Sequence, residues 1–86
     1  MPKNTWNYRI MIDDHGGKNQ VTYSIHEVFY DKEGSPEDYT KMPETMLSND
    51  LEEIFWCLEH YIKAFALPMI SIPNFPMEVP IHENFQ

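Results

Sequence analysis

Cysteine is almost absent from this sequence, because Cys57 is the only one among 86 residues. A single cysteine cannot form a disulfide within the chain, and secreted domains of this size usually depend on several. The segment from Met1 to Thr5 lacks the apolar core of a signal peptide, and no apolar run is long enough to span a bilayer. We therefore expect a cytoplasmic protein with no membrane partner.

Basic residues are also scarce. Six Lys and Arg residues stand against fourteen Asp and Glu residues, which gives a formal net charge of −8. This charge opposes the approach of phosphate backbones and anionic lipids, so direct nucleic-acid binding is disfavoured. The charge of most acidic proteins serves solubility alone. The alternative is that the charge has a function. The chain would then be an acidic inhibitor from a phage or mobile element, and carboxylates grouped on one face would mimic nucleic acid.

Glycine is rare, and the residue patterns of common catalytic or metal sites are missing. The pair Gly16-Gly17 is not followed by a helix start, so it does not form a phosphate-binding loop. Cys57 falls within a helical pattern, where an inert thiol is expected. The acidic turn Asp13–His15 matches the spacing of neither an EF-hand nor an H-E-x-x-H helix. We expect no enzyme activity, no cofactor and no metal.

The chain does contain enough apolar residues to fold. Hydrophobic residues make up 42%, with five Phe, five Tyr and two Trp. A chain this short buries only about 60–65% of the surface of its unfolded form, so its stability is expected to be small. We expect a single domain, and a homodimer would be one way to add buried area.

Two segments have the pattern of β-strands. Apolar residues alternate from Trp6 to Ile12, a turn-rich segment follows, and residues 21–30 are rich in β-branched and aromatic side chains. Glu27 interrupts the apolar face of the second segment. Either it lies at the sheet margin, or a bulge near His26 and Glu27 exchanges the two faces, which we favour. Residues 37–42 are a third, short candidate strand.

The strongest pattern is an amphipathic helix from Asp50 to Ala66. Its apolar residues recur at three- and four-residue steps: Leu51, Ile54, Phe55, Leu58, Tyr61, Ile62 and Phe65. Residues 48–50 offer N-cap side chains, and Asn49 with Glu52 resembles a capping box. Pro68 ends the helix, after which residues 69–72 would add an edge strand.

We therefore predict an α+β fold in which a small antiparallel sheet of three or four strands packs against one amphipathic helix. This β-β-β-α(-β) domain would span residues 1–72. Prolines at positions 73, 76 and 80 indicate an extended C-terminal arm over residues 73–86.

Two motifs carry a resemblance to known proteins. The run Trp6-Asn7-Tyr8-Arg9 and the run Ile25-His26-Glu27-Val28-Phe29-Tyr30-Asp31, closed by Gly34, resemble a family of small, uncharacterised bacterial proteins. Members share W-N-Y-R, I-H-E-V-Y-Y-D-x-x-G and an acidic amphipathic helix. The resemblance covers Trp6 to about Ile70, and Phe29 replaces the usual Tyr. It implies a compact β-β-β-α unit, and no catalytic role can be carried over from it. The order of elements is also similar to that of HicB-type antitoxins, which bind a toxin partner, as a fold-level analogy only.

One candidate pocket involves His26 and Glu27. An imidazole beside a carboxylate supports proton transfer or ligand binding when both face one pocket. Neighbouring strand residues point to opposite faces, so a structural role is favoured unless a bulge redirects one of them.

The candidate partner-binding residues lie on the helix and on the arm. Trp56 falls opposite the apolar stripe, near Lys63, where it is either covered by a loop or serves as an interface anchor. The arm offers Phe75, Met77 and Phe85, which would cover Trp56 or contact a partner or a second copy. We expect a protein-interaction or regulatory module.

Overall fold

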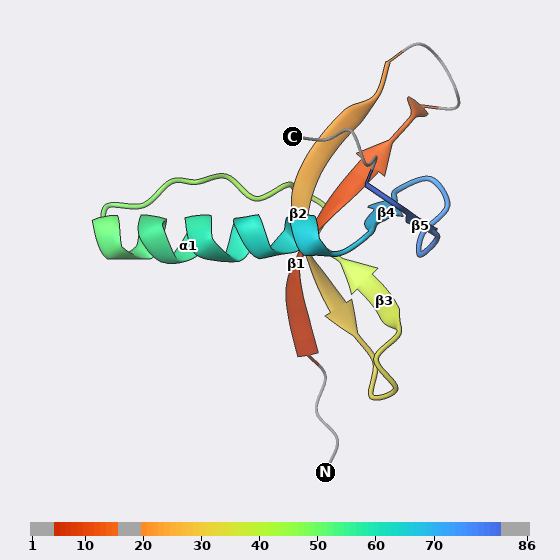
Figure 1. Cartoon of the computed structure of the whole chain (residues 1–86), viewed down its shortest axis with the longest axis horizontal. Coiled ribbons are helices and arrows are strands. Elements are labelled where there is room, and N and C mark those ends of the chain that lie inside the picture. Colours follow the sequence, from red (N-terminus) through yellow and green to blue (C-terminus); the bar gives the residue numbers. More distant parts are fainter. Residues whose placement is uncertain (1–4, 16–19, 82–86) are drawn as a thin grey trace.

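The computed structural model describes residues 5–15 and 20–81, which form a five-stranded mixed sheet and one long helix (Figure 1). The elements are β1 (Thr5–Asp13), β2 (Thr22–Tyr30), β3 (Pro36–Tyr39), α1 (Leu51–Lys63), the short 3-10 helix η2 (Ala64–Ala66), β4 (Met69–Ser71) and β5 (Glu78–Val79). The strand order is β3-β2-β1-β4-β5. The α+β class agrees with the sequence prediction.

The hairpin of β1 and β2 forms the centre of the sheet. Its antiparallel register runs without interruption from the pair Thr5 and Tyr30 to the pair Asp13 and Thr22. The first motif of the family resemblance therefore lies directly opposite the second. The predicted bulge near residues 26 and 27 is wrong, because the register is continuous there. An irregularity lies instead between β2 and β3, at Phe29 and Tyr30.

The turn between β2 and β3 explains the end of the second motif. The Asp31 carboxylate accepts hydrogen bonds from the backbone N–H groups of Glu33 and Ser35, both at 2.9 Å. Gly34 has a φ of 87°, a left-handed conformation that favours glycine. The third strand is confirmed in this region, but it spans residues 36–39 instead of 37–42.

The sheet has more strands than predicted, and it is not purely antiparallel. The predicted strand at residues 69–72 is present as β4, but it lies in the interior of the sheet, parallel to β1 and between β1 and β5. The edge on this side is β5, which falls within the predicted C-terminal arm and pairs antiparallel with β4. The chain returns from the helix to the middle of the sheet, which makes the sheet mixed.

The helix begins and ends close to the predicted bounds. Asp50 is the N-cap, and its carboxylate accepts a hydrogen bond from the Glu52 N–H at 3.0 Å. The predicted Asn49 cap is therefore displaced by one residue. α1 ends at Lys63, and η2 continues to Ala66, after which Leu67 is extended before Pro68.

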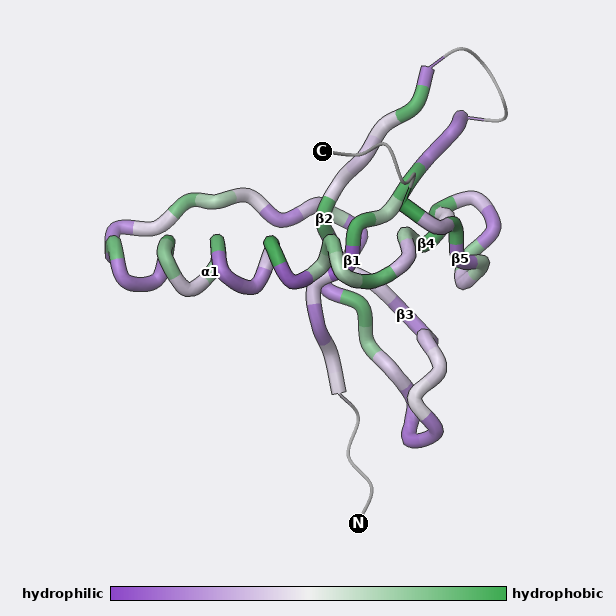
Figure 2. Tube along the Cα trace, in the orientation of Figure 1, coloured by the Kyte–Doolittle hydropathy of each residue, from purple (hydrophilic) through white to green (hydrophobic). Residues whose placement is uncertain are grey.

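The packing of the helix differs from the prediction. Tyr61 is the one buried residue of α1, and the first turns extend away from the sheet (Figure 1). Hydrophobic residues recur along the helix (Figure 2), yet most of the predicted core stripe is exposed. The helix therefore packs against the sheet through its C-terminal part and not along its full length.

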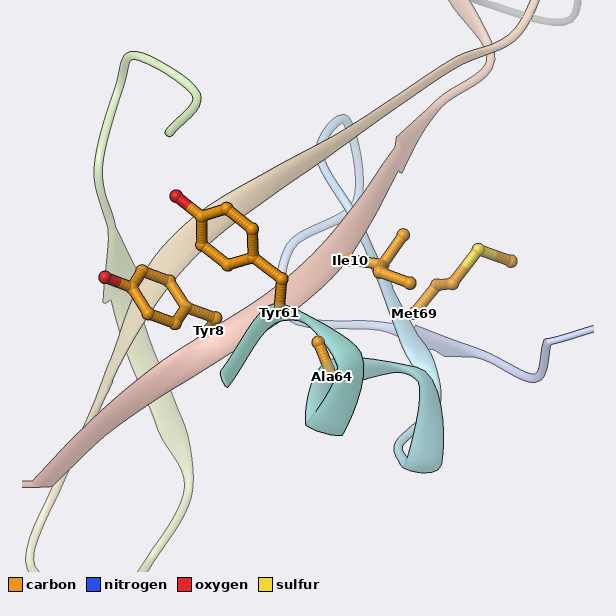
Figure 3. Close-up of a cluster of buried hydrophobic side chains, with 5 residues drawn as sticks. All are labelled: Tyr8, Ile10, Tyr61, Ala64 and Met69. Carbon is orange, nitrogen blue, oxygen red and sulfur yellow. The ribbon is translucent and has the colours of Figure 1, made fainter. Parts of the chain in front are cut away.

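Side chains are buried on both faces of the sheet. On one face, Tyr8, Ile10 and Met69 pack against Tyr61 and Ala64 from the end of the helix (Figure 3). On the other face, the fully buried Met11, Val28 and Ile70 form a second cluster, against which Tyr30, Tyr39, Ile72 and Phe75 pack. The sheet is thus covered on its second face by its own loops and by part of the predicted arm.

Candidate interaction site

A groove lined by aromatic side chains lies between α1 and the start of β1. Trp6 and Tyr8 are two residues apart on β1 and share one face of the strand. Trp56, His60 and Lys63 follow steps of four and three residues, so they share one side of the helix. Together with Asn7, Ala64 and Leu67, these residues enclose about 390 Å³. The crossing of strand and helix brings distant residues into one site, which we call the aromatic groove.

The rings of the aromatic groove form a continuous series of contacts from Trp6 to His60. Trp6 meets the edge of Tyr8 with ring centroids 5.3 Å apart, and Tyr8 meets Trp56 at 6.3 Å. Trp56 stacks on His60 at 3.7 Å. The Nδ1 of His60 lies 2.8 Å from the Trp56 carbonyl oxygen, and it donates to this oxygen in the tautomer that carries the hydrogen on Nδ1. These contacts hold the rings in fixed orientations, although Trp56 keeps 43% of its surface exposed.

The floor of the aromatic groove stays uncharged near neutral pH. Burial, together with Glu44 and other neighbours that carry or gain negative charge, raises the pKa of the Tyr8 hydroxyl to about 12. Lys63 is the charged residue in the lining, and its methylene stem adds apolar surface below the ammonium group. The groove is therefore suited to an apolar or aromatic group.

Two carboxylates lie close together behind this floor. Glu44, in the segment between β3 and α1, is held near β2 by its backbone N–H, which donates to the Ile25 carbonyl at 2.7 Å. Burial and the neighbouring Glu27 carboxylate raise the pKa of Glu44. Compared with the unfolded chain, the folded chain therefore favours the protonated form of Glu44. This contribution to stability is present below about pH 4.5, the ordinary pKa of the carboxyl group, and it is lost as the pH rises through the raised pKa of Glu44 in the folded chain.

We expect Glu44→Gln to raise the melting temperature at about pH 7, because the neutral amide removes the repulsion between the Glu44 and Glu27 carboxylates. The difference from the unmodified chain should shrink at about pH 4. Thermal melts followed by circular dichroism at both pH values would measure it. Glu33→Gln makes the same charge change on the exposed β2–β3 turn. An equal gain from that control would attribute the effect to net charge instead.

The structure does not bring His26 and Glu27 together. His26 pairs with Arg9, and Glu27 pairs with Tyr8, so their side chains leave opposite faces of β2. His26 is 2% exposed, and its Nδ1 donates to the Thr40 carbonyl at 2.7 Å while its Nε2 lies 2.9 Å from the Ser24 hydroxyl. Both ring nitrogens thus join β2 to neighbouring chain, which is a structural role.

The predicted partner-binding residues are divided among three places. Trp56 and Lys63 lie together in the aromatic groove. Phe75 packs within the chain against Tyr39, with ring centroids 4.9 Å apart, and Met77 is exposed in the turn before β5. Phe85 lies outside the described residues. The described part of the arm does not cover the aromatic groove.

Sequence reasoning missed Trp6 and His60 as members of the site. The alternation from Trp6 to Ile12 correctly placed Trp6 on the same face as Tyr8, but no local pattern states which face the helix crosses. His60 could have been found from its spacing, since it follows Trp56 by one helical turn.

The described residues offer neither a membrane-spanning helix nor a metal site. They contain no helix long and apolar enough to cross a membrane, and no group of three or more His, Cys, Asp and Glu side chains arranged to hold a metal ion. Comparison of the chain with protein families, with curated proteins and with solved structures found no match. The resemblance carried by the two motifs therefore stays a prediction.

Proposed function

We propose that this chain is a cytoplasmic protein-interaction module that receives an apolar side chain of a partner protein in the aromatic groove. The observation that carries the proposal is the convergence of Trp6, Tyr8 and Trp56, from two elements, on one partly open groove. Tryptophan and tyrosine are enriched among the residues that dominate binding energy at protein interfaces.

The net charge of −8 favours a partner whose surface is basic around the apolar group. Opposite charge speeds the encounter and disfavours acidic competitors, whereas the apolar anchor supplies most of the affinity. Binding of this kind weakens as salt rises.

The arrangement of the acidic residues favours this proposal over mimicry of nucleic acid. A mimic needs its carboxylates on one face. Here the acidic groups lie at the ends of three elements that point in different directions (Figure 1). Asp13 and Asp14 lie at the end of β1, Asp31 and Glu33 lie in the β2–β3 turn, and Glu52 and Glu53 lie in the first turn of α1.

The test is selection of binding peptides from a random displayed library with the full chain as bait. We expect basic peptides that share an aromatic or large aliphatic residue. Trp56→Ala should weaken their binding at least about tenfold. The control is Phe55→Ala, which removes an exposed aromatic ring one residue away, outside the groove. Isothermal titration would measure both dissociation constants.

Selected peptides that bind equally well to the Trp56→Ala chain would contradict the proposed site. Equal losses for Trp56→Ala and Phe55→Ala would contradict it as well, because the binding would then follow general helix hydrophobicity and not the groove.

A further inference from the structure

The first half of β1 has no strand beside its outer edge. β2 pairs with β1 along its whole length, from Thr5 to Asp13, whereas β4 pairs with β1 only at Met11 and Ile12. Among the described strands, β4 is the neighbour of β1 on that side (Figure 1). The segment from Thr5 to Tyr8 therefore has a free edge, which we call the β1 edge.

The hydrogen-bond pattern shows which backbone groups point towards the β1 edge. The Glu27 carbonyl accepts from the Thr40 N–H at 3.0 Å, on the side of β2 away from β1. Glu27 and its partner Tyr8 are therefore a pair without mutual hydrogen bonds, and such pairs occur at every second residue. The N–H and C=O groups of Trp6 and Tyr8 thus point away from β2. No described residue donates to them or accepts from them.

Pro68 explains why β4 does not continue along the β1 edge. In the parallel ladder, the Ile72 N–H donates to the Ile12 carbonyl at 2.9 Å. The bonds of such a ladder recur every two residues, so a longer β4 would place the N–H of residue 68 opposite the Tyr8 carbonyl. Proline has no N–H, and the Pro68 carbonyl accepts from the Arg9 guanidinium instead, at 2.6 Å.

The aromatic groove runs along the β1 edge. Successive strand residues point to opposite faces of a sheet, so a cavity that contacts Trp6, Asn7 and Tyr8 in turn lies along the edge of the strand. The other lining residues come from α1, η2 and Leu67, and about 390 Å³ lies between them. Open space is thus present beside backbone groups that lack partners.

We propose that the partner adds a short extended segment to the β1 edge as a sixth strand, and that the side chain inserted into the aromatic groove belongs to this strand. The inference rests on the proposed function and specifies the conformation of the partner. Trp6 and Tyr8 each present one donor and one acceptor, and an extended backbone matches such a row of groups. Every second residue of the segment then faces the groove.

Charge and length favour a segment of a partner protein over a second copy of the chain. Two identical edges would pair only over the few residues from Thr5 to Tyr8. They would also bring together two chains of net charge −8, which repel each other. A basic segment meets no such repulsion. Its backbone supplies the hydrogen bonds, and its anchor side chain supplies the apolar contact and the specificity.

Amide hydrogen exchange of the full chain, measured residue by residue by NMR, tests whether the β1 edge is open. The N–H groups of Trp6 and Tyr8 should exchange at least about tenfold faster than those of Asn7 and Arg9, which point towards β2. The alternation within one strand is the internal control. A Tyr8 amide as protected as the Asn7 amide would mean that a second copy or the chain itself covers the edge, which overturns the proposal.

The basic peptides selected with the full chain as bait test the added strand. Saturation with such a peptide should slow the exchange of the Trp6 and Tyr8 amides at least about tenfold and leave Asn7 and Arg9 unchanged. N-methylation of the peptide removes one backbone donor at a time. It should weaken binding about tenfold at alternate positions and have little effect at the positions between them, as isothermal titration would measure.

Trp6→Pro and Trp6→Ala form a matched pair of variants. Both remove the indole ring, but only proline also removes the outward N–H, which a strand tolerates at a free edge. We expect the selected peptide to bind Trp6→Pro at least about threefold more weakly than Trp6→Ala. Circular dichroism verifies that both variants fold. Equal dissociation constants would contradict backbone pairing at Trp6.

Failure of this inference is distinguishable from failure of the proposed function. A peptide that requires Trp56 but leaves the Trp6 and Tyr8 amides in fast exchange would keep the aromatic groove as the binding site and overturn strand addition. An N-methylation series without alternation would overturn it too. Binding that Trp56→Ala leaves unchanged, or a selection that yields no peptide, would overturn the proposed function and strand addition together.

Discussion

Replacing Ile70 with alanine is expected to lower the free energy of unfolding by about 2–5 kcal/mol. Ile70 is fully buried in β4, where it packs with Met11 and Val28 on the face of the sheet opposite the helix. The substitution removes apolar area and leaves a cavity that the flanking strands cannot fill. A loss of this size is comparable with the whole stability of a small domain, so the variant should be largely unfolded.

Ile62→Ala is the control, because it removes the same atoms from a residue that is mostly exposed. We expect a change within about 0.5 kcal/mol. Urea denaturation followed by circular dichroism measures both variants. If the two substitutions cost the same, the burial of β4 in the centre of the sheet would be wrong.

Local periodicity predicted the elements whose pattern is long. The alternation in β1 covers several residues, and the helix repeats its apolar residues over more than three turns. Both signals arise from the chain's own geometry, so no knowledge of the remaining fold is needed. The N-cap at Asp50 was likewise predicted to within one residue, because its side-chain chemistry is typical of helix starts.

The short strands show why the sheet topology was not predicted. β4 has three residues and β5 has two, which is too few for a period to be recognised. The place of β4 depends on pairing with β1, more than fifty residues earlier in sequence, and the place of β5 depends on pairing with β4. Prolines on either side of β5 suggested an irregular arm, although a two-residue edge strand between prolines violates no rule for β-structure.

The helix shows a second limit of sequence reasoning. An amphipathic pattern indicates which residues avoid water, but it does not state what covers them. We assigned the whole stripe to the sheet, whereas Tyr61 and Ala64 at the C-terminal end make the buried contact. For the same reason the aromatic groove was found only in part, since only the crossing of β1 and α1 places Trp6 and Trp56 in one groove.

Arg9→Met is expected to lower the free energy of unfolding by about 3–5 kcal/mol. Arg9 is 4% exposed in β1. Its guanidinium donates to the Tyr30 hydroxyl at 2.7 Å, to the Pro68 carbonyl at 2.6 Å and to the Glu78 carboxylate at 3.2 Å. Methionine preserves most of the side-chain volume, so the loss reports the hydrogen bonds and not a cavity.

The Arg9 side chain joins parts of the chain that are distant in sequence. Tyr30 in β2 in turn donates to the Asn7 side chain at 2.7 Å, which returns the network to β1. Pro68 precedes β4, and Glu78 begins β5. Without the guanidinium, the partly buried Tyr30 hydroxyl and the partly buried Pro68 carbonyl lose their donor. Amide hydrogen exchange should then accelerate first in β4 and β5, because these strands lose a contact to the hairpin.

Glu78→Gln separates the ion pair from the remainder of the network. The Glu78 side chain is 51% exposed, and exposed ion pairs contribute about 0–1 kcal/mol. We therefore expect Glu78→Gln to cost less than about 1 kcal/mol, and Arg9→Lys to fall between the two, because lysine keeps the charge but not the planar set of donors. A Glu78→Gln loss equal to that of Arg9→Met would mean that one salt bridge, and not the hydrogen bonds to Tyr30 and Pro68, fixes β4 and β5 to the hairpin.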